Sequence, residues 1–119
     1  MPPKDKETAI WIVGELRAIN CRDILLKGSV HKFINIRRMA ISAMGKIANK
    51  DFEVPLMRAL DDSNPQVVLY AIKALGKIDS KKAINKIKIL EEKWDKSYIK
   101  NACENYIESL KEENPNLKE

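Results

Sequence analysis

The chain has 119 residues, of which 45% are hydrophobic and 33% are charged, and its formal net charge is +5. This length suits one domain with a buried core, and the balance of apolar and charged residues excludes a disordered chain. No apolar run reaches the roughly 18 residues that a membrane span needs.

The start, MPPKDKET, lacks the basic and apolar stretches of a signal peptide. The two cysteines, Cys21 and Cys103, lie far apart without metal-ligand spacing and fit a reducing compartment. We therefore expect a cytoplasmic protein that does not span a membrane. The Met-Pro-Pro start and the charged tail suit a complete chain.

The predicted elements form a series of helix pairs. In chain order, the helices are expected at about residues 5–18, 21–28, 33–48, 51–60, 64–78, 80–94 and 96–111. The best-marked helix begins at Asn64 and Pro65, because Asn caps a helix and Pro suits its first position. Its apolar residues recur at helical spacing; they are Val67, Ala71, Leu75 and Ile78. Gly76, near its end, indicates either close packing or helix termination.

The first helices of the pairs repeat every thirty-one residues. AISAMGKIANK at residues 40–50 returns as AIKALGKIDSK at residues 71–81. The repeat gives one column of alanines, one of isoleucines closed by a cysteine, and one of glycines: Ala9, Ala40, Ala71 and Ala102; Ile10, Ile41, Ile72 and Cys103; Gly14, Gly45 and Gly76. A fixed period of this length predicts stacked units that share one continuous core.

The second helices show apolar columns that step by thirty residues instead. These columns are Ile24, Lys27 and Val30; Val54, Met57 and Leu60; and Ile84, Ile87 and Leu90, followed by Trp94. We expect the loops to absorb the one-residue drift, because loops accept length changes more readily than buried faces. Trp94 is expected in the core.

The phrase NPQVVLYAIKALGKID, followed by AINKIKIL, resembles the HEAT-like repeat of phycobilisome lyases over about residues 5–111. The resemblance implies an all-α fold, namely an α-solenoid of antiparallel helix pairs with about 3.5 repeats and a period of about 31 residues. It also implies that the second helices line the concave side. Many such repeats carry an Arg after the Val. Arg37 holds that position, but Val68 and Ile99 replace it later, so we expect no polar ladder along the stack.

We expect one domain over residues 1–113, with repeats at about 5–30, 33–61, 64–94 and 96–111 and a flexible tail at 114–119. No catalytic, cofactor or metal site is expected. His31 is the sole histidine, and Cys103 occupies the isoleucine column as a buried thiol. The paired acids, such as Asp61 and Asp62, suit a solvated surface. A bilin-lyase-like activity ranks third among the functions considered.

The predicted helix 80–94 carries a basic stripe with one apolar member, and Arg58 extends it. The stripe consists of Lys82, Lys86, Ile89 and Lys93. It suits an acidic protein segment or a nucleic-acid backbone, although it lacks the interleaved aromatics that stack on bases. A merely solvated lysine-rich helix is the alternative interpretation.

Trp11 and Leu69 form a second candidate surface, because their repeat equivalents are polar; incidental surface residues explain them equally well. We therefore expect a non-catalytic scaffold module that presents a curved helical surface to a protein partner, with an acidic partner favoured by the lysines. A nucleic-acid-binding accessory protein is the alternative. Neither the identity of the partner nor the oligomeric state follows from the sequence.

Overall fold

The computed structural model describes residues 22–113, and every regular element in that part is helical. The elements are α2 (Arg22–Ser29), α3 (Ile34–Ile47), the 3-10 turn η2 (Lys50–Phe52), α4 (Glu53–Ala59), α5 (Pro65–Lys77), α6 (Ile84–Lys93) and α7 (Ser97–Glu113). Six of the predicted helices are thus confirmed, each with ends within about one turn of those expected. The predicted helix 5–18, Cys21, Trp11 and the tail 114–119 lie outside the described residues.

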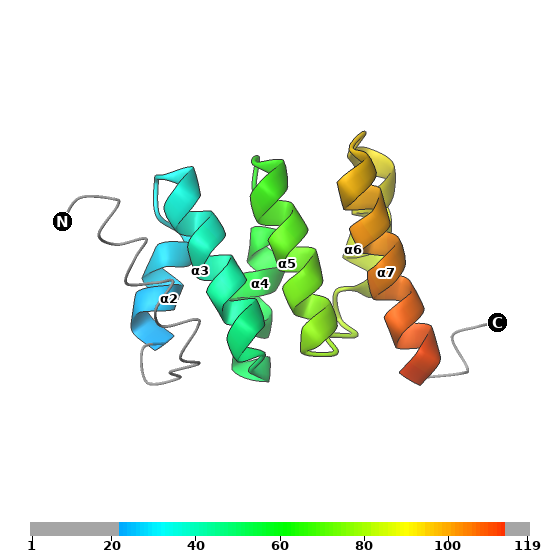
Figure 1. The fold of residues 1–119 in the computed structure, drawn as a ribbon, viewed down its shortest axis with the longest axis horizontal. Helices are drawn as coiled ribbons and strands as arrows, with labels where there is room; N and C mark the ends of the chain where they lie inside the picture. Colours follow the sequence, from blue (N-terminus) through cyan, green and yellow to red (C-terminus); the bar gives the residue numbers. More distant parts are fainter. Residues whose placement is uncertain (1–21, 114–119) are drawn as a thin grey trace.

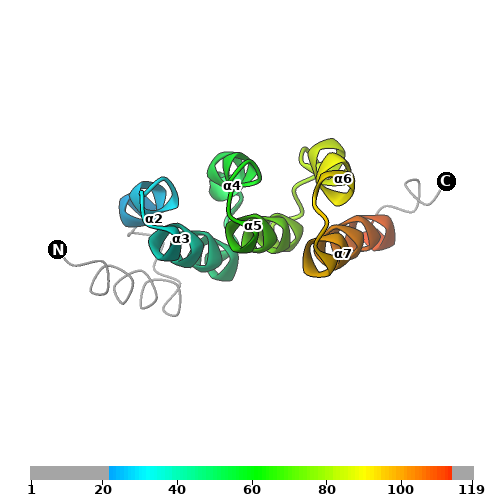
Figure 2. The ribbon, with the colours of Figure 1, turned by 90° about the horizontal axis from the view of Figure 1, so that it is seen from above.

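The helices alternate between two layers (Figure 1). Figure 2 shows α3, α5 and α7 side by side in one row, with α2, α4 and α6 in a second row. We call these the A layer and the B layer. Neighbouring A helices pack against each other, and each A helix also packs against the B helix that precedes it. Because no helix here can bury an apolar stripe alone, the two rows share a single core.

The start of α5 follows from its sequence. The side-chain oxygen of Asn64 accepts hydrogen bonds from the backbone N–H groups of Gln66 at 2.9 Å and Val67 at 3.3 Å. Pro65 stands at the first helical position, where its missing N–H costs nothing. The predicted cap is therefore confirmed.

The ends of α3 and α5 repeat as well. Ala48 and Asp79, thirty-one residues apart, both adopt the left-handed conformation, with φ of 56° and 55°. This conformation commonly ends a helix. Gly45 and Gly76 lie three residues earlier, inside the helices, so they do not terminate them.

Burial confirms the columns predicted for the A helices. Ala40, Ala71 and Ala102 are buried, and so are Ile41, Ile72 and Cys103. The small alanines let adjacent A helices approach, while the larger residues fill the space between the layers. Equivalent positions of α3, α5 and α7 are thus buried in the same way.

The thirty-residue columns predicted for the B helices are confirmed only in part, because Leu60, Ile87 and Leu90 are buried whereas the members on α2 and at the start of α4 are not. Ile24, Val30 and Val54 are 44%, 65% and 61% exposed. The residues that the B helices bury recur every thirty-one positions instead, in two sets: Leu25, Leu56 and Ile87; and Gly28, Ala59 and Leu90. Helices α2 and α4 have only 8 and 7 residues, so two apolar stripes fit either helix and spacing alone does not select the inner one.

The two glycines of the described A helices differ in surroundings, which gives a first prediction. A methyl group at Gly45 would lie 3.1 Å from the Cβ of Ala74 on α5, whereas one at Gly76 would meet no heavy atom closer than the Tyr106 ring at 3.7 Å. We expect Gly76→Ala to raise the free energy of unfolding by about 0.5–1 kcal/mol, because alanine favours helix. Gly45→Ala gains less or loses stability, since α3 and α5 must separate. Urea denaturation of both variants measures the difference, and equal gains would contradict the close approach at Gly45.

Tyr106 ties α7 to the turn before α6. Its hydroxyl donates a hydrogen bond to the carbonyl of Ser80 in the buried interior. Burial raises the pKa of Tyr106 from 10.0 to about 12, and it also raises the pKa of the Cys103 thiol from 9.0 to about 11. Both groups are therefore neutral in the fold at physiological pH.

A second prediction follows from the raised pKa of Tyr106. The unfolded chain releases the phenolic proton of Tyr106 at a lower pH than the folded chain does. The contribution of the protonated phenol to the free energy of unfolding is therefore complete below pH 10 and is lost as the pH rises to about 12. We expect the Tyr106→Phe variant to lose about 1 kcal/mol near neutral pH through the missing hydrogen bond. It should also show a weaker fall in the free energy of unfolding between these pH values. Urea denaturation over a pH series tests this, and parallel pH curves for both proteins would refute it.

Candidate functional site

The predicted basic stripe lies on the B layer, but α6 begins at Ile84, so Lys82 lies in the turn before the helix rather than on it. Ile89 is 64% exposed, and Lys82 and Lys93 are also exposed. Lys86 is only partly exposed and reaches back toward α4. The stripe is therefore a real surface feature, but its four residues are not equally open to a partner.

Two lysines of the stripe pair with acids of the preceding unit. The Lys86 ammonium lies 2.7 Å from a carboxylate oxygen of Asp61 and 3.4 Å from the carbonyl of Met57 at the end of α4. The Lys82 ammonium lies 3.8 Å from the Glu53 carboxylate. The contact between Lys86 and the Met57 carbonyl links α6 to α4. The same carbonyl also accepts the backbone N–H of Leu60 at the end of the helix. The pairs with Asp61 and Glu53 reduce the positive charge that the stripe offers to an anion.

Arg58 stands on α4 at the position that Ile89 holds on α6, and Lys27 holds it on α2. All three side chains are exposed, and they stand at equivalent positions of the three B helices. Sequence reasoning missed Lys27, because the thirty-residue column had placed it on the buried face. A hollow of about 210 Å³ between α2 and α4 is lined by Ser29, Val30, Arg37, Pro55, Arg58, Ala59, Asp61 and Asp62. Arg58 forms its rim without an ion pair to any described residue.

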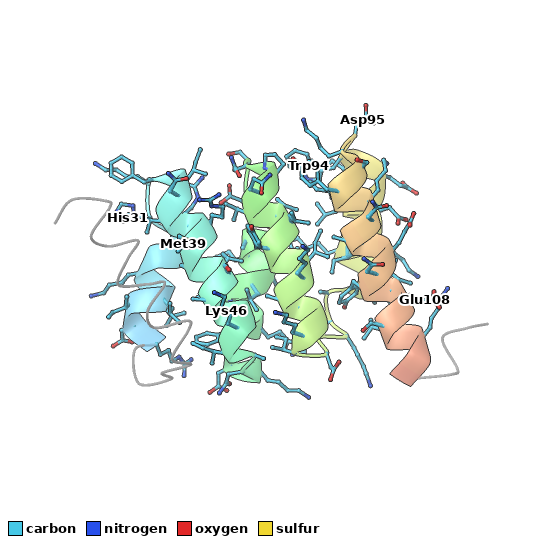
Figure 3. All side chains as sticks on the ribbon, viewed as in Figure 1. His31, Met39, Lys46, Trp94, Asp95 and Glu108 are labelled. Carbon is cyan, nitrogen blue, oxygen red and sulfur yellow. The ribbon has the colours of Figure 1, made fainter. Side chains whose placement is uncertain are left out.

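The structure describes one of the two residues of the second candidate surface. Leu69 lies on α5, is half-buried and packs against the core, and Trp11 lies outside the described residues. Trp94 follows α6, as Figure 3 shows, and is also half-buried against the core. Leu69 thus has a structural role at the rim of the core, whether or not it contacts a partner.

Arg37 connects three segments. Its guanidinium contacts both carboxylate oxygens of Asp62, at 2.8 and 3.2 Å, and donates to the carbonyls of His31 at 3.0 Å and Lys32 at 3.1 Å. Asp62 also accepts the backbone N–H of Asn64 at 2.9 Å. The corresponding residues, Val68 and Ile99, are buried apolar side chains. Among the described repeats the Arg contact is therefore a single link rather than a ladder.

In the described part of the chain, the groups that could serve in catalysis or metal binding are His31, Cys103 and clusters of acidic or metal-ligating side chains. Within residues 22–113, no group of three or more His, Cys, Asp or Glu is close enough to hold a metal ion. The Nδ1 atom of His31 accepts the backbone N–H of Phe33 at 3.1 Å, and the two rings stack. Cys103 is buried, and its raised pKa of about 11 keeps the thiol protonated.

The A layer holds a basic cluster that the sequence reasoning missed. Lys73 and Lys77 lie one turn apart on the outer side of α5. Lys46 lies on the lower half of the neighbouring α3 (Figure 3). All three side chains line a hollow of about 220 Å³ between α3 and α5. The i, i+4 spacing of Lys73 and Lys77 is visible in the sequence, but only the packing of α3 on α5 places Lys46 at the same hollow.

The membrane-spanning potential of the helices and the similarity of the chain to known proteins bear on the site as well. No helix among the described residues is long and apolar enough to cross a membrane. A family model described as HEAT repeats matches residues 22–108, which is most of the chain. No curated protein matches the sequence.

Proposed function

The chain belongs to the HEAT-repeat family, and from this premise we propose that it is a non-catalytic protein-interaction module. HEAT repeats generally mediate contacts between proteins. The observation that carries the proposal is an exposed surface of mixed apolar and basic side chains on rigidly packed helices. Such a surface binds a partner without reorganising, which lowers the entropic cost of association.

We further propose that the helix pairs form an α-solenoid of about 3.5 repeats, with the B layer as its concave side. The thirty-one-residue spacing of the buried columns in both layers supports this architecture. The regular alternation of A and B helices in Figure 2 supports it as well.

The contact surface that we assign first consists of Arg58, Ile89 and Lys93. Ile89 supplies exposed apolar area, and the two cations favour an acidic segment of a partner protein. Lys82 and Lys86 lie at the edge of this surface, where pairing with Glu53 and Asp61 already occupies them. The partly neutralised stripe favours a protein partner over a nucleic-acid backbone, which gains most from unpaired cations.

The proposed absence of catalysis rests on the chemistry of the candidate groups. The protonated, buried thiol of Cys103 is a poor nucleophile, and His31 belongs to the turn between α2 and α3 at the opposite end of the row (Figure 1). A lyase-like activity would require a nucleophile or base that these two residues do not provide.

Affinity capture by variants tests the proposed surface. We expect proteins retained by the immobilised wild-type chain to bind Ile89→Asp at least about tenfold more weakly, because a charge replaces the central apolar contact. Asn101→Asp makes the same change of charge on α7, at an exposed position of the other layer, and serves as the control. Equal losses in both variants, or none in either, would contradict this assignment.

A further inference from the structure

The outer side of the A layer carries two adjoining hollows that share α5 as their common wall. One lies between α3 and α5 and has a volume of about 220 Å³; the other lies between α5 and α7 and has a volume of about 310 Å³. Lys73 and Lys77 line both. The two hollows therefore form one surface, which we call the α5 surface.

The α5 surface is basic on its α3 side. The residues that line either hollow include no Asp or Glu. Lys73 and Lys77 are exposed, and neither forms an ion pair with a described residue. In contrast, two lysines on the B side, Lys86 and Lys82, pair with Asp61 and Glu53. Lys73 and Lys77 are therefore exposed cations on α5 that a carboxylate-bearing partner can pair with.

The α7 side of the α5 surface has an apolar floor. Ile72, Ala102 and Tyr106 line it, and Gly76 contributes no side chain. A methyl group placed on Gly76 would lie 3.7 Å from the Tyr106 ring, an ordinary van der Waals contact, so the hollow has room for an apolar group at this point. Asn105 and Ser109 supply the polar rim. Apolar walls with a few polar groups are typical of a pocket that takes an apolar side chain.

The basic part of the α5 surface does not continue onto α7. The residues of α7 that correspond to Lys73 and Lys77 are Glu104 and Glu108, and both are exposed. Figure 3 shows Glu108 on α7 and Lys46 on α3, on either side of α5. A nucleic-acid strand that ran along the A layer would meet repulsion at α7, because its phosphates repeat without a break. A short acidic segment meets the lysines and ends before the glutamates.

We propose that the α5 surface binds an acidic, amphipathic peptide segment of a partner protein. Its carboxylates pair with Lys73 and Lys77, and one large apolar side chain enters the hollow above Gly76. This site lies on the layer opposite to the surface of Arg58, Ile89 and Lys93, so it adds a second partner contact to the proposed function. Neither site depends on the other.

Selection from a random peptide library displayed on phage tests the proposal with the full chain as bait. We expect the enriched peptides to combine Asp or Glu with a large apolar residue. Synthetic copies should bind at least about tenfold more weakly to the double variant Lys73→Glu/Lys77→Glu in fluorescence anisotropy. The double variant Lys81→Glu/Lys88→Glu has the same net charge, alters exposed lysines of the B side, and should bind within about twofold of wild type.

Two further variants test the cations and the hollow of the α5 surface separately. Lys73→Gln/Lys77→Gln removes the cations without placing acids near the helix C-terminus, and it should weaken binding in the same direction. Gly76→Leu fills the hollow and should lower the affinity of peptides that carry the apolar residue. Circular dichroism establishes that each variant is folded.

Several results would overturn the proposal. One is an enriched pool that is basic or lacks apolar residues, and another is the absence of any enrichment. Undiminished binding by both double variants at residues 73 and 77 is a third, and tighter binding of a single-stranded oligonucleotide is a fourth. Peptides that lose affinity only for Ile89→Asp would overturn the α5 surface while supporting the B-layer surface.

Discussion

Replacing Arg37 by alanine is expected to lower the free energy of unfolding by about 2–4 kcal/mol. The guanidinium of Arg37 and the carboxylate of Asp62 are only 17% and 11% exposed, so water replaces the lost contacts poorly. The variant also leaves the carbonyls of His31 and Lys32 without this donor. Because Asp62 additionally accepts the N–H of Asn64, the cap of α5 loses support as well.

A double-mutant cycle of Arg37 and Asp62 measures their coupling. Arg37→Lys keeps the charge but lacks the planar fork that reaches both carboxylate oxygens, so it should recover only part of the loss. Lys86 and Asp61 form the matched control, since their contact is closer to solvent and should couple by no more than about 1 kcal/mol. A similarly small coupling for Arg37 and Asp62 would show that this link does not hold α3 to the α4–α5 turn.

Leu56→Ala is expected to lower the free energy of unfolding by about 2–5 kcal/mol, whereas Val54→Ala should change it by less than about 1 kcal/mol. Both residues lie on α4, but Leu56 is fully buried and Val54 is 61% exposed. Truncating Leu56 removes contacts to its buried neighbours and leaves a cavity between the layers.

This pair of variants distinguishes two registers of the B helices. The thirty-residue column that the sequence suggested places Val54 inside, while the thirty-one-residue burial places Leu56 inside. Denaturant titration of the two proteins, with unfolding followed by circular dichroism, gives both values. A larger loss for Val54→Ala would favour the first register and contradict the observed packing.

The A helices were predictable from the sequence because their signals agree with one another. The Asn64–Pro65 start and the apolar stripe from Val67 to Ile78 point to one helix and one buried face. The alanine column repeats without interruption, and the isoleucine column ends in another buried residue, Cys103, so register and burial follow together. The short B helices lack such agreement, since each carries apolar residues on two faces, and only packing against the A layer selects one.

The candidate site was predictable in its composition but not in its geometry. The spacing of the lysines follows from the sequence, yet Lys86 on α6 reaches Asp61, twenty-five residues earlier in the turn after α4, a contact that only the folded arrangement brings about. The same applies to Arg37, whose partner Asp62 lies twenty-five residues later in the turn between α4 and α5. Lys46 on α3 lines the same hollow as Lys73 and Lys77 on α5, and no local pattern predicts that arrangement.

The two layers offer a partner different chemistry. On the B layer, exposed Ile89 lies among cations that acids partly neutralise, and on the A layer, Lys73 and Lys77 border an apolar hollow. With both proposed surfaces occupied, we expect two proteins, or two segments of one protein, to be held at a fixed distance. In that arrangement a second contact gains from the effective concentration that the first creates.

Affinity capture with the purified chain, before and after nuclease treatment of the extract and over a series of salt concentrations, tests the central claim most directly. We expect a specific protein partner to remain bound after nuclease treatment and at moderate salt, because apolar contacts contribute to its binding. Capture that disappears with nuclease or with a modest rise in salt would contradict a protein-interaction module and would support phosphate-backbone binding.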